Sequence, residues 1–429
     1  MGRGLYNDLK IGFPWRPMTS LYPQTYSETL RHLYPRTNGG IKLGLTNTEK
    51  LLAAVGDPQH AMAHIVVAGT NGKGSTSSLI AEALSHAGYR VGLYTSPHLL
   101  RFTERIKVNG QEITEEAVVK HYQTVLSKES RCDYPPTFFE VVTAMTLLEF
   151  QARQVDIAVL EVGLGGRLDS TNVVQKDLAV LTPIALDHQQ FLGDTLAAIA
   201  KEKAGIIPHH GRAVTAPQPQ EVLSVLEHTC KERETTLQVS HAAAPLALDS
   251  FPAFQQVNIH TAFTACLALN QTPFQVEPRH FQLALESWRW PGRFHSLGTT
   301  PEIILDGAHN PHAISSLLES LPPHSGPFHA VFSATTTKDA AALVALLANR
   351  VESLHLCPSS VPRSLSFTEL QDISEGRYPI YQNSGQALAT AKDLALAGNG
   401  IVLVTGSLFL VADVLHSETR VTRDPPIAS

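Results

Sequence analysis

The sequence lacks the features of a membrane, secreted or disulfide-rich protein. No stretch approaches the roughly 18 uninterrupted apolar residues of a membrane-spanning helix, and the first residues have no apolar centre of a secretory signal. The 429 residues include only four cysteines, and no two have the close spacing of a zinc or redox motif. We therefore expect reduced, structural thiols in a cytoplasmic protein without a membrane partner.

The sequence also lacks an excess of positive charge, low-complexity tracts and internal repeats. Its formal net charge is -6, whereas duplex-binding proteins usually have a basic surface, so nucleic acid is not an expected partner. Hydrophobic residues make up 43% and charged residues 17% of the chain, which is typical of a folded globular protein. Because 429 residues exceed the size at which one core usually stops growing, we expect two or more domains.

Short apolar runs alternate with helix-like segments in the first part of the chain. Four runs predict buried strands at residues 64–69, 90–96, 155–162 and 178–184. Apolar residues at steps of three and four predict helices at residues 75–87, 139–153 and 195–204. This alternation is typical of a doubly wound, mainly parallel sheet with helices on both faces.

A second α/β series follows the turn-rich segment at residues 290–293. It predicts strands at 302–308, 327–334, 351–357, 378–382 and 400–407, and helices at 311–321, 338–348, 384–397 and 408–415. We therefore divide the chain into residues 1–296, of which about the first 35 are an extension, and residues 297–429, a smaller Rossmann-like α/β domain.

The strongest chemical signal is a Gly-rich loop between the first predicted strand and its helix. It reads Gly69-Thr70-Asn71-Gly72-Lys73-Gly74-Ser75-Thr76. Backbone N–H groups and the helix N-terminus attract phosphates, Lys73 would neutralise their charge, and Ser75 would offer a hydroxyl to Mg²⁺. The spacing departs from the usual P-loop pattern, because Gly74 separates Lys73 from Ser75. The alternative is a simple strand-to-helix turn, but this density of glycine, lysine and hydroxyl groups favours phosphate binding.

Polar residues also end three later strands, at the sheet edge where ligands bind in such folds. Glu161 is equally consistent with a magnesium ligand and with a salt-bridge partner. His188, after Asp187, more often caps a strand than binds Mg²⁺, and Lys203 resembles an exposed helix lysine. Asp306 and the segment 309–312 form either a helix cap or part of a site.

These segments, in this order, resemble the Mur ligase superfamily and, within it, folylpolyglutamate synthase and dihydrofolate synthase. The resemblance covers about Lys42 to Val414 and rests on GTNGKGST, LEVGLGGRLDSTN, ALDH, KEKAGI and LDGAHNP. It implies that ATP phosphorylates the carboxylate of a dihydropteroate or folate and that the amine of L-glutamate displaces the phosphate to form an amide. The GGRLDSTN form is similar to that of the bifunctional bacterial members, and we expect a monomer.

The resemblance also implies roles for individual residues. The ATP-binding positions are Asn71, Gly72, Lys73, Gly74, Ser75, Asn258, Arg293 and Asp306. Two Mg²⁺ sites use Ser75, Ser96, Glu161, His188 and Lys203, the last as a carbamylated lysine. Lys73, Lys203 and His309 are the catalytic candidates. The substrate positions are Thr137, Phe138, Phe139, Leu168, Asp169 and Ser170, whose aromatic rings would stack on the pterin.

Two departures from the family pattern leave the substrate contacts open. Lys42 stands where bacterial members often have an acidic residue, and VFSATTTKD lacks the glycine and the acidic residue usually found before Lys338. Two other functions remain as alternatives: another Mur-type amino-acid ligase of peptidoglycan synthesis, and a non-catalytic ATP-binding switch. The switch would have no use for Lys203 or for a second metal ligand.

Overall fold

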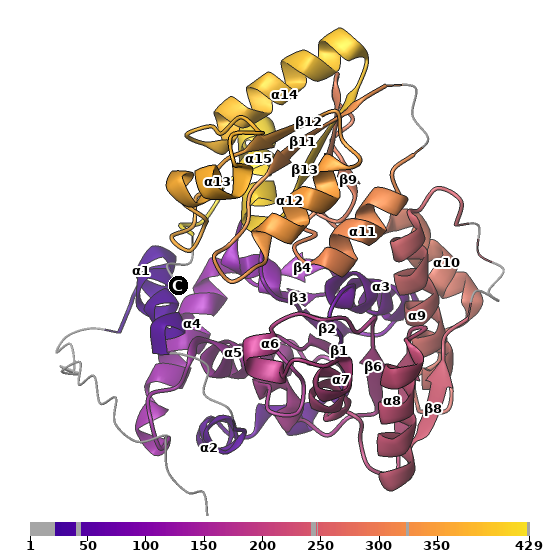
Figure 1. The fold of residues 1–429 in the computed structure, drawn as a ribbon. Helices are drawn as coiled ribbons and strands as arrows, with labels where there is room; N and C mark the ends of the chain where they lie inside the picture. The colour runs from indigo at the N-terminus through magenta and orange to yellow at the C-terminus, as the bar shows by residue number, and fades with distance from the viewer. Residues whose placement is uncertain (1–21, 40–43, 242–245, 247, 323–325, 427–429) are drawn as a thin grey trace, which may run out of the picture.

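The computed structural model describes residues 22–39, 44–241, 246, 248–322 and 326–426. Within these residues the chain forms an eight-stranded sheet and a five-stranded sheet, each flanked by helices, with the smaller unit stacked on the larger one (Figure 1). The prediction of two α/β units, the first of them doubly wound, is confirmed. No helix in the described ranges is long and apolar enough to cross a membrane.

The larger sheet is mainly parallel. Its strands are β1 (Ala63–Ala68), β2 (Val91–Tyr94), β3 (Ile106–Val108), β4 (Gln111–Glu112), β5 (Ile157–Glu161), β6 (Leu178–Leu181), β7 (Arg212–Thr215) and β8 (Thr236–Val239), in the order β4-β3-β2-β5-β1-β6-β7-β8. Only β3 and β4 run antiparallel to their neighbours. The chain passes from β1 to β2 on one side and from β5 to β6 on the other, so a crevice opens at the carboxyl end of β1.

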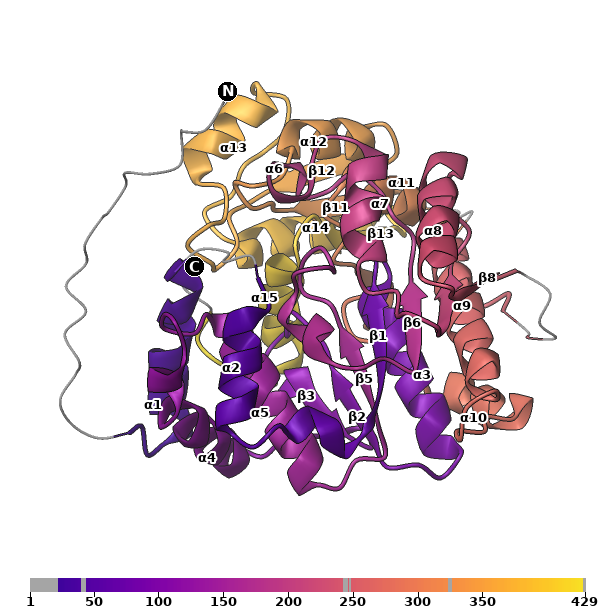
Figure 2. The same ribbon diagram turned by 90° about the horizontal axis from the view of Figure 1, so that it is seen from below.

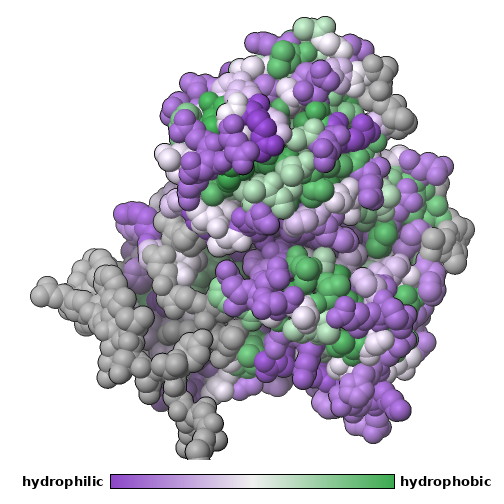
Figure 3. Space-filling view, in the orientation of Figure 1, coloured by the Kyte–Doolittle hydropathy of each residue, from purple (hydrophilic) through white to green (hydrophobic). Residues whose placement is uncertain are grey.

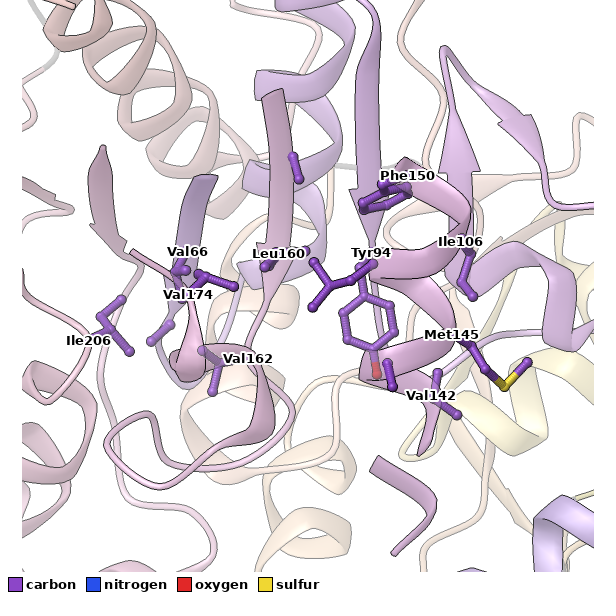
Figure 4. Close-up of a cluster of buried hydrophobic side chains, with 14 of the residues drawn as sticks. Val66, Tyr94, Ile106, Val142, Met145, Phe150, Leu160, Val162, Val174 and Ile206 are labelled. Carbon is purple, nitrogen blue, oxygen red and sulfur yellow. The ribbon is translucent and has the colours of Figure 1, made fainter. Parts of the chain in front are cut away.

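Helices cover both faces of this sheet (Figure 2). One face packs against α3 (Lys73–His86), α9 (Ala253–Leu269) and α10 (Pro278–Ser287). The other face packs against α1 (Tyr26–Leu33), α2 (Thr46–Ala54), α4 (Glu115–Leu126), α5 (Phe138–Ala152), α7 (Leu196–Ala204) and α8 (Gln220–Glu232), with α6 (Gln189–Leu192) beside α7. Side chains alternate along each strand, so that Ile65 and Val67 face the first core while Val66 faces the second, where it lies near Leu160 (Figure 4).

The helix α1 falls in the segment that we expected to be an extension. Thr25 caps it through a reciprocal hydrogen-bonded pair with Glu28, and Leu30 and Leu33 are buried in the core beside α4. Residues 26–33 are therefore packed as part of the larger domain. Lys42, one of the departures from the family pattern, lies outside the described residues.

The smaller sheet has the order β12-β11-β13-β10-β9 and is parallel except for β9. Its strands are β9 (His295–Ser296), β10 (Glu302–Leu305), β11 (Phe328–Phe332), β12 (Ser353–Leu356) and β13 (Ile401–Thr405). The helices α11 (Pro311–Glu319), α12 (Ala340–Ala348) and α13 (Phe367–Ser374) cover one face, and α14 (Ser384–Gly398) and α15 (Leu408–Thr419) cover the other.

The strand predicted at residues 378–382 was wrong. The segment makes only one isolated bridge, between Ile380 and Leu356 at the edge of the sheet. Pro379 has no N–H group, so a regular ladder cannot continue through it. The preceding helix α13 was not predicted.

Candidate active site

A cavity of about 460 Å³ lies between the two sheets, at the carboxyl ends of β1, β5 and β6. Figure 3 shows hydrophilic residues where the two units meet. Thirteen of the positions predicted for ATP, metal or catalysis line this cavity: Asn71, Gly72, Lys73, Gly74, Ser75, Ser96, Glu161, His188, Lys203, Asn258, Arg293, Asp306 and His309. Residues from distant parts of the sequence thus converge on one space.

The Gly-rich loop forms a tight passage from β1 into α3. Gly69 and Gly72 have φ angles of +149° and +87°, a region that side chains rarely adopt. A Cβ atom on Gly69 would lie 1.9 Å from Thr182 Oγ1, and one on Gly72 would lie 2.0 Å from Asn258 Oδ1. The loop therefore requires glycine at both positions, and α3 starts at Lys73 with its N-terminus toward the cavity.

Lys73 and Glu161 form the charged floor of the cavity. Lys73 Nζ donates to the carbonyl oxygens of Gly69 and Thr70, each at 3.2 Å. The carboxylate of Glu161 is buried, and the backbone N–H of Ser96 donates to it at 3.0 Å. Burial raises the pKa of Glu161, although Lys73 opposes the shift; burial likewise lowers the pKa of Lys73 against the pull of Glu161. Each group would gain from further ionic partners.

Lys203 is not the exposed helix lysine that its surroundings in the sequence indicate. Only 5% of the residue is exposed, and its Nζ donates to Gly69 O at 2.8 Å. Burial, assisted by the charge of Lys73, lowers the pKa of Lys203 to about 7. Burial therefore favours the unprotonated amine, the form of a lysine side chain that acts as a nucleophile.

Asp187 is a residue of the cavity that the sequence analysis did not assign to the site. It accepts hydrogen bonds from Lys338 Nζ at 2.5 Å and from Asn310 Nδ2 at 3.2 Å, and His309 Nε2 lies 3.6 Å away. Burial alone would raise its pKa, but the hydrogen bond with His309 and the charge of Lys338 hold it well below its usual range. Asp187 therefore joins the larger domain to three side chains of the smaller one.

The smaller domain supplies a second set of polar groups. Asp306 is buried and accepts from the backbone N–H groups of Phe294 and Ala308 at 2.7 and 2.8 Å. The Arg293 guanidinium lies against Gly307, where an added Cβ would come within 2.4 Å of Nη1. His309 Nδ1 lies 2.8 Å from Gly307 O and donates to it, while Nε2 lies 3.6 Å from Asp187 and donates toward that carboxylate when the ring carries both protons.

The loop itself also contacts the smaller domain. The side-chain amides of Asn71 and Asn310 donate to each other at 3.0 and 3.3 Å, and Asn71 Nδ2 lies 3.1 Å from His312 Nδ1. Asn310 in addition caps α11 by accepting from the Ala313 N–H. The position of α11 is thus coupled to the phosphate loop.

The six predicted substrate positions do not line the cavity. Thr137 caps α5, Phe138 is buried, and Asp169 accepts from the N–H groups of Gly163 and Leu164, which do line the cavity. The Phe139 ring is partly exposed and covers Gly163, since a Cβ there would lie 2.6 Å from the ring. Leu168 and Ser170 are partly and fully buried, respectively. Of the six residues, Phe139 and Asp169 therefore contact the cavity-lining segment 163–165.

The donor set can hold a divalent cation with help from a phosphate. Within the described residues, no group of three or more His, Cys, Asp or Glu side chains could hold a metal ion by itself. Mg²⁺ usually takes one or two carboxylates and completes its shell with water and substrate phosphates. Glu161 beside the hydroxyl-bearing phosphate loop fits this pattern.

A phosphate loop with its own lysine, a buried carboxylate and a second lysine from α7, facing a second α/β domain, is an arrangement suited to ATP-dependent phosphoryl transfer, and the family models identify it as that of a Mur-type ligase. Residues 67–244 match the Mur ligase middle domain, and residues 292–408 match the Mur ligase glutamate ligase domain. The folylpolyglutamate synthase of Lacticaseibacillus casei is 34% identical over 91% of this chain and 97% of its own. The dihydrofolate synthase/folylpolyglutamate synthase of Escherichia coli K12 is 35% identical over 90% of this chain and 93% of its own.

Solved structures of folylpolyglutamate synthases and dihydrofolate synthases are also similar to this chain. The E. coli FolC complex with DHPP and ADP has a TM-score of 0.83 at 33% identity, covering 94% of this chain and 99% of that one. The bifunctional Yersinia pestis enzyme with AMPPNP and Mn also has a TM-score of 0.83, at 30% identity. This match covers 94% of this chain and 100% of that one. The chain belongs to the folylpolyglutamate synthase and dihydrofolate synthase family. It is an ATP-dependent ligase that adds glutamate to folates, which confirms the resemblance and its predicted activity.

Proposed function

We propose that this ligase is bifunctional and adds L-glutamate both to dihydropteroate and to the glutamate tail of a reduced folate. The observation that carries the proposal is a cavity where the phosphate loop, Glu161 and Lys203 face Asp306 and His309 of the second domain. The assignment of both activities is supported by the similar E. coli and Yersinia pestis proteins, whose names include both. In a cavity lined by both domains, the acyl phosphate and the amine of glutamate would bind close enough to react. We take the larger domain as residues 1–296 and the smaller as residues 297–429, acting as a monomer.

The nucleotide would lie with its phosphates on the N-terminus of α3, between the domains. Gly72, Gly74 and Ser75 present the loop, Lys73 offsets phosphate charge, and Arg293 reaches the same space from the smaller domain. Asn71, Asn258 and Asp306 complete the nucleotide contacts. Relatives of this chain are described with ADP, with AMPPNP and with Mn.

Two Mg²⁺ sites would form around Glu161. Ser75, Ser96 and Glu161 would hold one ion, and Glu161, His188 and a carbamylated Lys203 the other. Bound there, the ions would neutralise charge on the transferring phosphoryl group. A protein carboxylate and phosphate oxygens are the donors that this cation favours.

The buried amine of Lys203 supports the proposal that this lysine is carbamylated. The nitrogen lone pair attacks the carbon of CO₂, an N–C bond forms, and the amine proton leaves to solvent, so a neutral group becomes an anion. The pKa of about 7 supplies the unprotonated amine that this reaction needs. The resulting carbamate would face Lys73 and replace the missing third acidic donor.

The side chains then divide the work of the two chemical steps. Lys73 and Arg293 offset charge as the substrate carboxylate attacks the γ-phosphoryl group and ADP leaves. His309, with Nε2 toward Asp187, would orient the amine of glutamate for attack on the acyl phosphate, and phosphate leaves as the amide forms. The pterin would stack near Phe139. The other residues that we place around the pterin are Thr137, Phe138, Leu168, Asp169 and Ser170.

A phosphate-release assay tests the proposal. Purified protein with ATP, Mg²⁺ and L-glutamate should release phosphate with dihydropteroate and, separately, with tetrahydrofolate, and mass analysis should find one added glutamate per turnover. Phosphate release with only one acceptor would remove the bifunctional assignment. Release only with a sugar-linked peptide acceptor would remove the folate assignment altogether.

A further inference from the structure

Arg105 is the largest fully buried side chain in the described part of the structure, with 2% of the residue exposed. It ends the short 3-10 helix Phe102–Arg105 and leads into β3. Among the described residues no carboxylate lies within ion-pair distance of it, and its Nη1 has no hydrogen-bond partner. The neighbouring Glu104 is engaged elsewhere, because its carboxylate accepts three backbone N–H groups, from Leu99, Leu100 and Arg101.

A buried cation without a carboxylate partner is unfavourable for folding, so its neighbours indicate what it does. Arg105 Nε donates to His98 Nδ1 at 2.8 Å, and the guanidinium lies 5.1 Å above the ring of Phe138. Its own carbonyl oxygen accepts from the Thr95 N–H at 3.0 Å. One side chain thus connects the segment 95–98 with the first turn of α5.

Both connected segments border the cavity. Ser96 and Pro97 line it directly, and the Ser96 N–H donates to Glu161. On the other side, Phe138 packs edge-on against Phe139, with ring centroids 5.7 Å apart, and Phe139 covers the cavity residue Gly163.

Tyr34 closes the group of rings around the guanidinium. It stacks on His98 at a centroid distance of 6.3 Å and is tilted against Phe138 at the same distance. Tyr94, which lies in the core near Val142 and Leu160 (Figure 4), faces the guanidinium from β2. The guanidinium is therefore enclosed by His98, Phe138 and Tyr94.

We propose that Arg105 is a positioning residue for the acceptor: it fixes the loop 96–98 relative to the Phe138–Phe139 end of α5, and so sets the distance between the two borders of the cavity where the flat heterocycle would bind. This inference rests on the proposed function, since it takes Phe139 as a wall of the acceptor site. It assigns no contact between Arg105 and the acceptor or the nucleotide. The nucleotide end of the cavity, built on α3, does not depend on it.

Arg105→Lys tests the proposal because it keeps the charge and removes the Nε donor and the flat group over Phe138. The KM for dihydropteroate should rise about tenfold, the effect of one lost hydrogen bond to a charged group. The Kd for ADP, and kcat at saturating acceptor, should stay within about twofold of the wild-type values. His98→Gln should raise the same KM, and the double variant should add little, because the two residues act through one contact.

Glu149→Gln is the matched control. Glu149 and His121 form a buried pair at 2.7 Å between α4 and α5 in the same domain, and neither lines the cavity. This variant should lower the Tm and leave the KM for dihydropteroate unchanged. If Arg105→Lys behaved in the same way, Arg105 would be a structural residue and the proposal would be wrong.

Two further outcomes separate the possible failures. If Arg105→Lys does not fold, His98→Gln decides: an unchanged KM for dihydropteroate overturns the proposal. Calorimetric titration of the wild type with dihydropteroate tests the underlying function directly. No binding by a wild type that still binds ADP would overturn the proposed function and this inference with it, whereas normal binding by both the wild type and Arg105→Lys would overturn the inference alone.

Discussion

Lys338 Nζ of the smaller domain lies 2.5 Å from Asp187 Oδ1 of the larger one, and both side chains are about nine-tenths buried. Asp187 lines the cavity, as does His309, whose Nε2 lies 3.6 Å from the Asp187 carboxylate. The two partners of the ion pair are 151 residues apart in the sequence. The ion pair therefore joins the two domains next to the cavity-lining residues Asp187 and His309.

We therefore predict that Lys338→Met lowers kcat/KM about a hundredfold, because breaking a buried pair leaves Asp187 without its main counter-charge and costs about 3 kcal/mol. The secondary structure should not change. Lys392→Met, which breaks the half-buried pair of Lys392 with Glu418 at 2.9 Å within the smaller domain, is the control. Steady-state kinetics of the two variants provide the measurement, and equal losses would show that the Asp187 pair has no special role.

Lys203→Ala should abolish ligation, by at least about a thousandfold, while the Kd for ADP changes little, because the loop loses one hydrogen bond at Gly69 O but keeps those from Lys73 to Gly69 and Thr70. Lys201→Ala, on the exposed side of the same helix, should behave as the wild type.

The activity of the wild type should also depend on bicarbonate. This dependence should be strongest below pH 7, since a Lys203 pKa of about 7 means that acid protonates the amine and blocks carbamate formation. A carbamate carbon signal in ¹³C NMR that Lys203→Ala lacks would be the direct evidence, and its absence from the wild type would count against the modification.

The sequence predicted those parts of the site that are marked by neighbouring residues in the chain. Glycine, lysine and hydroxyl groups between a strand and a helix identify the phosphate loop within eight residues, and Glu161 is marked by its place at the end of an apolar strand. Lys203 has no such signal. It lies in a KEK run typical of an exposed helix surface, and only the family resemblance gave it a role, although the fold buries it against Gly69 O.

The parts that the sequence did not predict depend on contacts between distant segments. Asp187 was visible as a polar strand end, but nothing near it indicates Lys338 or Asn310 as partners. The helix α1 was predicted to be part of an extension, because its sequence does not show that its leucines are buried. They are buried by packing beside α4, which is distant in the sequence. The segment 378–382 has an apolar pattern of the right length, and Pro379 at a sheet edge overrides it.

His64 should make the stability of the larger domain depend on pH. Burial on β1 lowers its pKa to about 4, below the ordinary 6.5, so the unfolded chain binds the extra proton first. Stability should therefore be complete above pH 6.5 and should be lost as the pH falls toward 4. His64→Gln should reduce the loss between pH 7 and 4.5 by about 2 kcal/mol in denaturant unfolding, whereas the exposed His209→Gln should not change it. Equal pH profiles for His64→Gln and the wild type would show that His64 is not responsible.

Gly72→Ala should weaken nucleotide binding by more than it weakens the fold. The new Cβ would lie 2.0 Å from Asn258 Oδ1 at a φ of +87°, so the strained loop or the Asn258 side chain, itself a predicted nucleotide contact, must move. We expect the Kd for ADP to rise at least about tenfold, equivalent to about 1.4 kcal/mol. Gly88→Ala is the matched control, because Gly88 has a similar φ of +93° and open space around its Cβ. It should lower the free energy of unfolding by about 1 kcal/mol through backbone strain and leave the Kd for ADP unchanged. If both variants bound ADP as the wild type does, the close contact between Gly72 and Asn258 would not determine the geometry of the phosphate loop.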